Sequence, residues 1–393
     1  MENQRRLRVL HVGKFYPPHI GGMETHLRTL CAQLKDAVDL QVIVANDGTH
    51  TVQSVLDGIR VTRLGTALYL YSTPVCPRMV RAIRGARADV VHVHLPNPWA
   101  VAAYLMSGHG GALVASWHSD VVRQKRLGRA YEVISRLFLR RCNAIIASSP
   151  NYVESSPVLS RNPAHCTVVP YGIAVSDFAC RDAAPIHNIR QRFGPRIVLS
   201  AGRLVYYKGL EYLIRAMNAV DAKLLIVGDG PMRPRLEAEA AANPLLRGRV
   251  KFLGRIEDVV PYYHACDVFV LPSVARSEAF GIVQLEAMAC GKPVVNTRLR
   301  SGVPFVSLHG VTGLTVAPGD PAQMAAALNR LLDDPELRHA LGNAALHRVR
   351  TEFTVGAMVQ RTLDVYRRVT GGSGGLERGE RIARGAGVAS AAT

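Results

Sequence analysis

Short apolar runs alternate with longer segments of helical periodicity along most of this chain. In the first half, the runs rich in Val, Ile and Leu are 7–12, 40–45, 89–94, 112–117 and 144–149. A second series follows at 196–201, 223–228, 250–254, 267–272 and 293–297. Continuous apolar strands separated by helices are typical of parallel sheets covered on both faces. The pattern therefore predicts an α/β fold with two parallel sheets.

The two series also predict how the chain divides. We expect a Rossmann-like N-terminal domain over 1–175, an irregular linker over 176–195, and a second Rossmann-like domain over 196–351. The tail, 371–393, is rich in Gly and charge and poor in large apolar residues, which predicts disorder. Ligands of open parallel sheets bind beyond the carboxyl ends of the strands. Two facing sheets therefore predict a binding site in the cleft between the domains.

The composition argues against several classes of protein. The seven cysteines are scattered without a C-x-x-C pair, so we expect reduced thiols, with neither a disulfide framework nor a zinc site. No apolar run approaches the roughly 18 residues of a membrane-spanning helix. The apolar segment near the N-terminus is too short for a secretory signal. These features predict a cytoplasmic protein.

The formal net charge of +18 raises the question of an anionic partner. Only seven of the 48 basic residues are Lys, as a GC-rich genome would produce, so the charge can be compositional. Basic residues cluster at 78–87 and 123–130, but no aromatic residues are interleaved and no helix-turn-helix or zinc-finger spacing appears. Nucleic acid is therefore not expected as a partner. An anionic membrane surface or a lipid phosphate stays open, with the protein peripheral on the inner face of the plasma membrane.

The stretch 277–295 places two carboxylates around an apolar run. Its periodicity predicts a short helix over about 281–290, in which Glu286 is the only charge. A buried carboxylate needs a donor, so Glu286 should either accept from the ribose of a nucleotide or pair with an internal Arg. Glu278 lies before the helix, beside Gly281, where free N–H groups attract anions. The stretch thus predicts a site for a phosphorylated ligand.

Three further loops follow predicted strands and should reach the same cleft. Gly21 and Gly22 permit close approach of the backbone before a helix, although glycine pairs often only make turns. Arg203 and Lys208 converge on one strand end and suit a diphosphate, the alternative being ordinary surface cations. His118 ends a strand and could face the cleft, or serve a purely structural role.

Two motifs that would indicate other chemistry are incomplete. The G-x-G at 228–230 lacks a third glycine and a later ribose-binding acid, so a dinucleotide cofactor is not expected. No D-x-D stands at a strand end to hold a divalent metal. We therefore expect no cofactor and no metal. The charge of a leaving diphosphate must then be met by Arg203, Lys208 and helix N-termini.

The chain resembles the retaining, metal-independent family 4 glycosyltransferases of the GT-B fold. The motifs that carry the resemblance are G-G-x-E-x-H at 21–26, H-S-D at 118–120, P-Y-G-I at 170–173, G-R-L-V-x-x-K-G at 202–209, V-G-D-G-P at 227–231 and E-A-F-G-I-V-x-x-E at 278–286. Tyr171 and Ala174 depart from the family pattern, where Asn and Asp are common. Both lie near the linker, so they affect hinge geometry more than chemistry.

The resemblance implies roles for the residues already singled out. Those matching Arg203 and Lys208 hold the donor diphosphate, and the one matching Glu286 binds the ribose. Glu278 and the backbone amides of Phe280 and Gly281 contact the donor sugar, and His118 lies beside the reacting centre. Gly21, Gly22, Gly228 and Ile282 complete the implied donor-binding set. The family also returns its last helix to the first domain, which here corresponds to 352–370.

These observations predict a transfer reaction. A hexose would move from a nucleoside-diphosphate sugar, of the GDP-mannose or UDP-hexose type, to an acceptor hydroxyl with retention of configuration. The acceptor would belong to a cell-envelope or lipid-linked glycan. By resemblance, the reaction is a same-face displacement in which the backbone carbonyl or ring of His118 favours the developing positive charge. The alternatives are a nucleotide-sugar epimerase or phosphorylase of the same fold, and a non-catalytic basic protein of the membrane surface.

Overall fold

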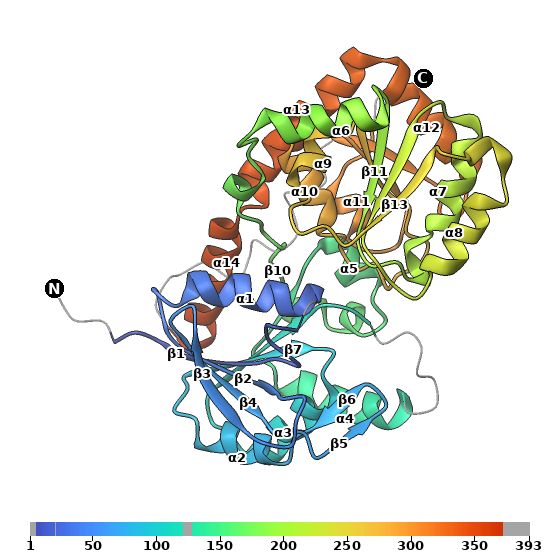
Figure 1. Ribbon diagram of the computed structural model, residues 1–393. Helices are drawn as coiled ribbons and strands as arrows, with labels where there is room; N and C mark the ends of the chain where they lie inside the picture. The colour runs from blue at the N-terminus through green and yellow to red at the C-terminus, as the bar shows by residue number, and fades with distance from the viewer. Residues whose placement is uncertain (1–4, 20, 121–127, 372–393) are drawn as a thin grey trace.

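Two parallel sheets, one in each half of the chain, form the framework of the computed structural model (Figure 1). The structure describes residues 5–19, 21–120 and 128–371, with only the backbone of 128–132. The predicted disordered tail lies outside the described residues from 372 onward, as do residues 123–127 of the second basic cluster and the side chains of 128–130. The prediction of an α/β fold with two parallel sheets is confirmed.

The N-terminal sheet has eight strands in the order β10-β9-β8-β7-β1-β2-β4-β3. Their bounds are β1 Arg8–Val12, β2 Asp39–Ala45, β3 Val52–Leu56, β4 Ile59–Leu64, β7 Val90–Leu95, β8 Ala112–Trp117, β9 Ala144–Ala147 and β10 Cys166–Val168. All pair in parallel except β3 with β4. A separate hairpin joins β5 (Leu68–Leu70) to β6 (Thr73–Val75).

The C-terminal sheet is parallel throughout, in the order β13-β12-β11-β14-β15-β16. Its strands are β11 Ile197–Ala201, β12 Lys223–Val227, β13 Val250–Gly254, β14 Val268–Leu271, β15 Val294–Thr297 and β16 Gly313–Val316. The strands missed by the apolar pattern, β3 to β6, β10 and β16, are very short or mix polar with apolar residues. Such strands give a weak periodic signal.

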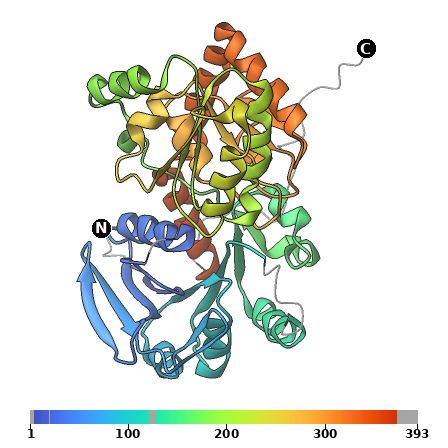
Figure 2. The ribbon, with the colours of Figure 1, turned by 45° about the vertical axis from the view of Figure 1, so that its right-hand side comes forward.

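Helices cover both faces of each sheet (Figure 2). In the first domain they are α1 Gly22–Leu34, α2 Arg78–Gly85, α3 Pro98–Ser107, α4 Gly128–Arg141 and α5 Pro150–Ser155. After the linker come α6 Ala183–Phe193, α7 Leu210–Ala216, α8 Arg233–Ala241, α9 Val260–Ala265, α10 Val283–Ala289, α11 Val303–Val306, α12 Pro321–Asp333, α13 Pro335–Glu352 and α14 Val355–Val369. Short 3₁₀ turns occupy Leu159–Arg161, Pro163–His165, Val175–Phe178, Tyr206–Lys208, Met217–Ala219 and Pro244–Leu246. None of the helices in the described part of the chain is long and apolar enough to cross a membrane.

The segment predicted to be irregular contains a helix. Asp182 caps α6 by accepting a hydrogen bond from the amide of Ala184. Ile189 and Phe193 pack into the apolar core of the C-terminal domain, and α6 lies against α9. The residues between Ile189 and Phe193 are polar or charged, so the sequence shows no clear helical period here. The apolar core of the C-terminal domain supplies the packing that stabilises this helix.

The last helix leaves the C-terminal domain. Figure 1 shows α14 running from α13 down to the first domain, where it packs against α1. Its apolar residues Met358, Leu363 and Val365 join the core formed by α1 and the first sheet. The two domains are therefore connected both by the 170–182 segment and by this returning helix.

Candidate active site

Residues from both domains meet where the carboxyl ends of the two sheets face each other. Arg276, after β14, donates to Asp120, after β8, at 2.9 Å. The ring of Phe280 packs edge-on against Tyr171 with 4.9 Å between centroids. Tyr171 in turn is hydrogen-bonded to His118, so the expectation that this position mainly concerns hinge geometry is wrong: its side chain belongs to the site. The loop that carries Glu278 thus lies directly against the end of β8.

The loop before α10 leaves backbone donors free. The helix begins at Val283 and not near 281, because Gly281 has φ +77° and breaks the helical path. A Cβ on Gly281 would lie 2.5 Å from a methyl carbon of Leu271, so both space and conformation require glycine. No described acceptor takes a hydrogen bond from the amides of Phe280, Gly281 or Ile282. These three N–H groups have no partner among the described residues, and their use by a ligand stays a prediction.

Glu278 and Lys208 form an ion pair across two loops. Lys208 Nζ lies 2.6 Å from Oε2 of Glu278, to which Ser273 also donates at 3.0 Å. The glutamate is only 8% exposed. Because a buried carboxylate needs compensation, Lys208 supplies its counter-charge in this state. The sequence predicted that both residues belong to the cleft but not that they pair.

Glu286 has a tyrosine as its partner. Tyr263 donates to Oε2 of Glu286 at 2.6 Å, and no described residue donates to the second oxygen. Burial raises the pKa of Glu286, while the hydrogen bond from Tyr263 and the charge of Lys208 act in the opposite direction. The alternative of an internal Arg partner is therefore wrong. One carboxylate oxygen remains for a ligand.

Arg203 lies at the rim of a small pocket at the end of β11. The pocket is lined by Ser200, Ala201, Gly202, Arg203, Leu204, Lys208, Leu210, Ile226, Val227 and Pro272. The Arg203 side chain is exposed, and no described residue accepts from its guanidinium. Gly228 has φ +124°, and a Cβ there would collide with the carbonyl of Gly202. Gly228 therefore packs against Gly202, which lines the pocket, and does not line the pocket itself.

His118 is held by both ring nitrogens. Nδ1 is 2.6 Å from the Tyr171 hydroxyl and Nε2 is 3.0 Å from Nδ1 of His94. Burial lowers the pKa of His118 well below its ordinary value, with a smaller contribution from His26, so the ring is neutral. No described residue donates to the His118 backbone carbonyl. Of the two groups that the sequence left open, the carbonyl is the one without a described hydrogen-bond partner.

Gly21 and Gly22 begin α1 beside this group. Gly21 is the N-cap, with extended backbone at φ −175°, and Gly22 is exposed. Four residues into the helix, His26 lies 5.1 Å from the ring of His118 and 4.6 Å from that of Tyr171. The first turn of α1 therefore opens towards the same cleft.

Several residues of the site escaped the sequence analysis. They are His11, His92, His94, Tyr263, Ser273, Arg276 and Tyr366, whereas Asp120 was noted only as part of the H-S-D motif. The sequence did contain one sign of these residues, the two histidines at 92 and 94 in the apolar strand β7. A polar side chain in such a strand needs a buried hydrogen-bond partner. The partners themselves come from distant parts of the chain, so the sequence offered no sign of them.

Two groups of histidines could reach a common metal ion. They are His11 with His92 and His94, and His26 with His94 and His118. Neither group includes a carboxylate. All ring nitrogens of His11, His92, His94 and His118 already have hydrogen-bond partners. A metal would have to displace some of these bonds.

Comparison with known proteins gives consistent results. The model of the Glycosyltransferase Family 4 domain matches residues 20–177, and the model of Glycosyl transferases group 1 matches residues 186–348. The chain is 34% identical to the D-rhamnosyltransferase WbpZ of Pseudomonas aeruginosa, over 88% of this chain and 92% of that protein. It is 30% identical to the O-antigen chain mannosyltransferase C of Escherichia coli, over 92% and 98% respectively.

A solved structure supports the fold. The Anabaena protein Alr3699/HepE, crystallised in complex with UDP, superposes with a TM-score of 0.76 over 92% of this chain and 100% of that one. The sequence identity is 21%. The predicted architecture of two facing Rossmann-like domains is confirmed at this level.

Proposed function

Because this chain belongs to the GT-B glycosyltransferases of the family 4 and group 1 type, we propose that it moves a hexose from a nucleoside-diphosphate sugar to a glycan hydroxyl with retention. One observation carries the proposal most directly. A Lys–Glu ion pair and three backbone amides without a described partner lie in loops of the C-terminal domain, and a loop of that domain contacts Tyr171, which is bonded to His118. This arrangement suits a ligand with an anionic leaving group and a hydroxylated ring.

Each side chain has a chemical task in this proposal. Arg203 and Lys208 stabilise the charge that develops on the leaving diphosphate. When Lys208 engages the phosphate, Glu278 is freed to accept from hydroxyls of the sugar. The amides of Phe280 and Gly281 orient the ring, and Glu286 accepts from the ribose with its second oxygen. The His118 carbonyl faces the positive charge of the oxocarbenium-like state, while the phosphate receives the proton of the acceptor.

The two relatives also inform the choice of donor. Their names describe transfer of mannose and of D-rhamnose, which is 6-deoxymannose. A manno-configured sugar is therefore the first donor to test, ahead of UDP-hexoses. One relative acts on an O-antigen chain, which favours a cell-envelope or lipid-linked glycan as acceptor. Gly21, Gly22 and Ile282 would contribute backbone to the donor site.

The direct test is a screen of radiolabelled nucleotide sugars with and without membrane extract. We expect label to enter the glycan or lipid fraction only when an acceptor is present. Donor consumption without any acceptor would favour an epimerase or phosphorylase instead. Failure of every donor to bind in calorimetry would favour a non-catalytic protein of the membrane surface.

Metal dependence gives a second prediction. Because Lys208 and Arg203 supply the positive charge near the pocket, we expect the transfer rate to be unchanged after dialysis against EDTA. The measurement is the initial rate in EDTA compared with the rate in added Mg²⁺. A strict requirement for Mg²⁺ would show that these cations do not suffice for the leaving group.

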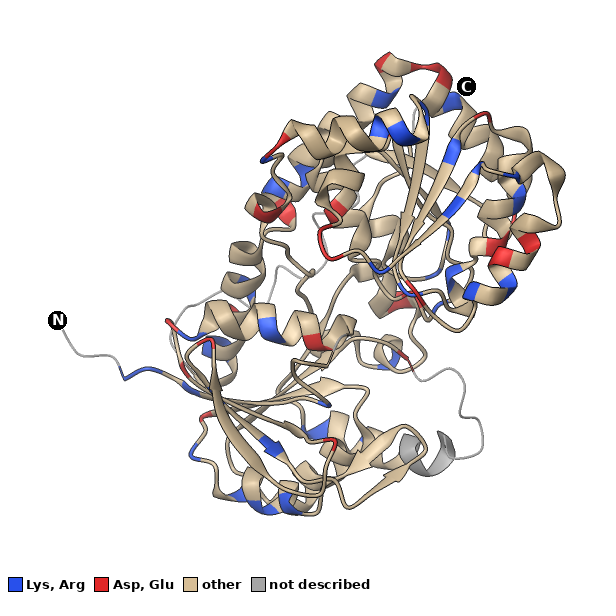
Figure 3. Ribbon diagram, in the orientation of Figure 1, with Lys and Arg blue, Asp and Glu red and all other residues tan. Residues whose placement is uncertain are grey.

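Membrane attachment is proposed through one surface of the N-terminal domain. There α3 packs against α2, α4 and β6. The exposed apolar side chains of this surface are Leu68, Tyr69, Leu70, Tyr71, Met106, Val133, Ile134 and Leu137. Exposed arginines of α2 and α4 lie among these elements, at 78, 81, 84, 136, 140 and 141, and Figure 3 shows the basic residues of α2 along the edge of the domain. Aliphatic and aromatic side chains flanked by Arg suit an anionic bilayer surface.

We therefore expect the protein to sediment with anionic liposomes at low salt and to be released as the ionic strength rises, because exposed charges are screened beyond about 8 Å at physiological salt. Replacing Leu70 and Tyr71 by Ser should weaken this binding. Leu245→Ser, in the other domain, removes a side chain of similar exposure and should leave it unchanged. Equal binding to neutral vesicles would refute the electrostatic part of the proposal. Binding to neither type of vesicle would contradict membrane attachment and would mean that the net charge reflects composition alone.

A further inference from the structure

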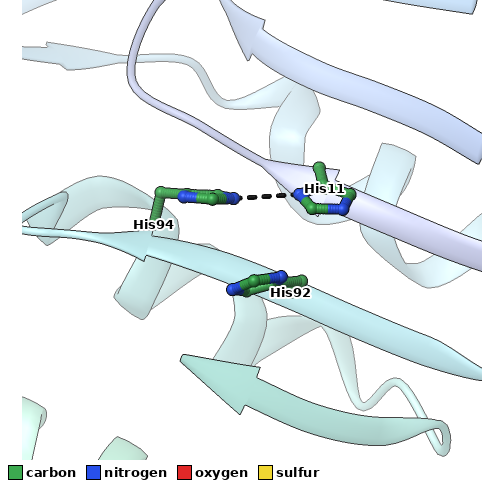
Figure 4. A group of neighbouring side chains, drawn as sticks. All are labelled: His11, His92 and His94. Atoms are coloured by element: carbon green, nitrogen blue, oxygen red, sulfur yellow. Dashed lines mark hydrogen bonds between the residues drawn. The ribbon is translucent and has the colours of Figure 1, made fainter. Parts of the chain in front are cut away.

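Seven buried or half-buried side chains form one unbroken series of hydrogen bonds through the N-terminal domain. In order they are Ser116, His92, Tyr366, His11, His94, His118 and Tyr171, here called the histidine chain, and the successive separations are 2.7, 2.6, 3.1, 2.9, 3.0 and 2.6 Å. Figure 4 shows His11 facing His94 from the neighbouring strand, with His92 beside them. The series ends at the cleft, where Tyr171 contacts Phe280.

The four histidines of the chain are neutral. Burial lowers the pKa of His11 to about 3 and places those of His92, His94 and His118 well below the ordinary value. A neutral imidazole has one N–H donor and one acceptor nitrogen. Each histidine therefore accepts on one side and donates on the other, because both of its nitrogens are bonded within the chain.

Only two arrangements of protons satisfy all these bonds. In the first, Tyr171 donates to His118, and every histidine carries its proton on Nε2, with Tyr366 donating to His92. In the second, all the bonds are reversed: every histidine carries its proton on Nδ1, and the hydroxyl proton of Tyr171 is free to face the cleft. A mixed pattern would direct two lone pairs or two N–H groups at each other, or would leave the buried Tyr366 hydroxyl without an acceptor.

From this coupling we propose that His92, Tyr366, His11 and His94 are positioning residues for the transfer reaction. They couple the tautomer of His118 to those of the other three histidines and hold its ring in one orientation, and so position its backbone carbonyl and the Tyr171 hydroxyl at the cleft. The inference rests on the proposed function. It also gives the returning helix a role beyond packing, since α14 contributes Tyr366, which joins His11 to His92.

A metal site is the competing explanation for the same cluster. His11, His92 and His94 could offer three nitrogens to one ion. However, the 2.9 Å between Nδ1 of His11 and Nε2 of His94 is the separation of a hydrogen bond, and the remaining nitrogens of these residues are bonded to His118, Tyr366 and Ser116. The complete set of partners favours the hydrogen-bonded chain.

The first test interrupts the chain at its tyrosine. Tyr366→Phe removes one hydroxyl and no packing volume, and should lower kcat by roughly 10-fold or more, because small errors in the placement of reacting groups slow transfer. The KM for the donor should change little, since Tyr366 touches no donor-binding residue. Tyr16→Phe is the matched control, because Tyr16 is buried in the same core and its hydroxyl has no described partner.

The second test asks whether the groups act as a unit. His94→Asn interrupts the chain at another link, so adding it to Tyr366→Phe should lower kcat no further than the more severe single change. Fully additive losses would indicate independent structural roles and would contradict the proposal. Melting temperatures of all variants identify any that fail to fold, and the conclusion is then drawn from Tyr366→Phe alone.

The deciding measurement needs no substrate. In ¹⁵N spectra of histidine-labelled protein, His11, His92, His94 and His118 should share one tautomer, and Tyr366→Phe should change the signals of His118 while Tyr16→Phe does not. Different tautomers among the four, unchanged signals of His118, or a stoichiometric metal in the purified protein would overturn the proposal. Shared tautomers in a protein that transfers no sugar would support the chain and contradict the proposed function instead.

Discussion

Lys208→Ala should lower kcat by roughly 100-fold, the loss typical when one pre-positioned donor to a developing negative charge is removed. Lys208 lies in the pocket at the end of β11, where the structure places a second cation, Arg203. Arg203→Ala should have a similar effect on turnover. The measurement is the initial rate of transfer at saturating donor. Lys251→Ala, at an exposed position of the same domain, is the control and should leave the rate unchanged.

Lys208→Ala also removes the ion pair with Glu278, so its effect on stability has to be separated from its effect on turnover. Removing Lys208 leaves a buried carboxylate without its counter-charge, which typically destabilises a protein by about 3–5 kcal/mol. The double variant Lys208→Ala, Glu278→Gln removes that charge and should recover melting temperature without recovering turnover. Because Glu278→Gln lowers kcat by itself, the double variant is compared with that single variant and should fall well below it. Equal turnover of the two would mean that Lys208 acts only on the fold.

Glu286→Gln and Glu278→Gln should impair different steps. Glu286→Gln weakens acceptance from the ribose, and hydrogen bonds to a charged group are worth about 1.5–3 kcal/mol, so binding of the nucleoside diphosphate should loosen by about 10-fold or more. Glu278→Gln should lower kcat more than it weakens that binding, because the nucleoside diphosphate lacks the sugar that Glu278 would contact. Calorimetry with the nucleotide and steady-state kinetics with the full donor separate the two effects.

Two further measurements decide the role of Glu286. A donor with 2′-deoxyribose should be poor for the native protein and lose little more in Glu286→Gln, since its partner hydroxyl is already absent. Tyr263→Phe should retain nucleotide binding, because Tyr263 occupies only one of the two carboxylate oxygens. If Glu286→Gln lowers the melting temperature by many degrees with no selective loss of nucleotide affinity, the carboxylate serves Tyr263 and not a ligand.

The amino-acid sequence by itself determined the two parallel sheets and the loops that form the cleft. In a parallel sheet the carboxyl ends of neighbouring strands meet at one edge, so the loops that carry Arg203, Lys208 and Glu278 were expected to converge. His118 ends a strand of the other sheet, and two facing sheets were expected to bring it to the same cleft. The sequence also indicated a close approach to the backbone beside Gly281, but it placed the start of the helix about two residues too early. These features depend on local pattern and on a simple rule of topology.

The tertiary structure alone decided which of these groups are partners. Tyr263 and Glu286, Lys208 and Glu278, and above all His11 and Tyr366 are joined across separations of up to 355 residues. The same is true of α6, whose helical period is completed by the core of the neighbouring domain. Hydrogen bonds between buried side chains need orientations that differ by fractions of an ångström, and no spacing along the chain encodes them. The sequence therefore predicts which residues reach the cleft, while packing determines which carbonyl, oxygen or ring nitrogen remains free to act there.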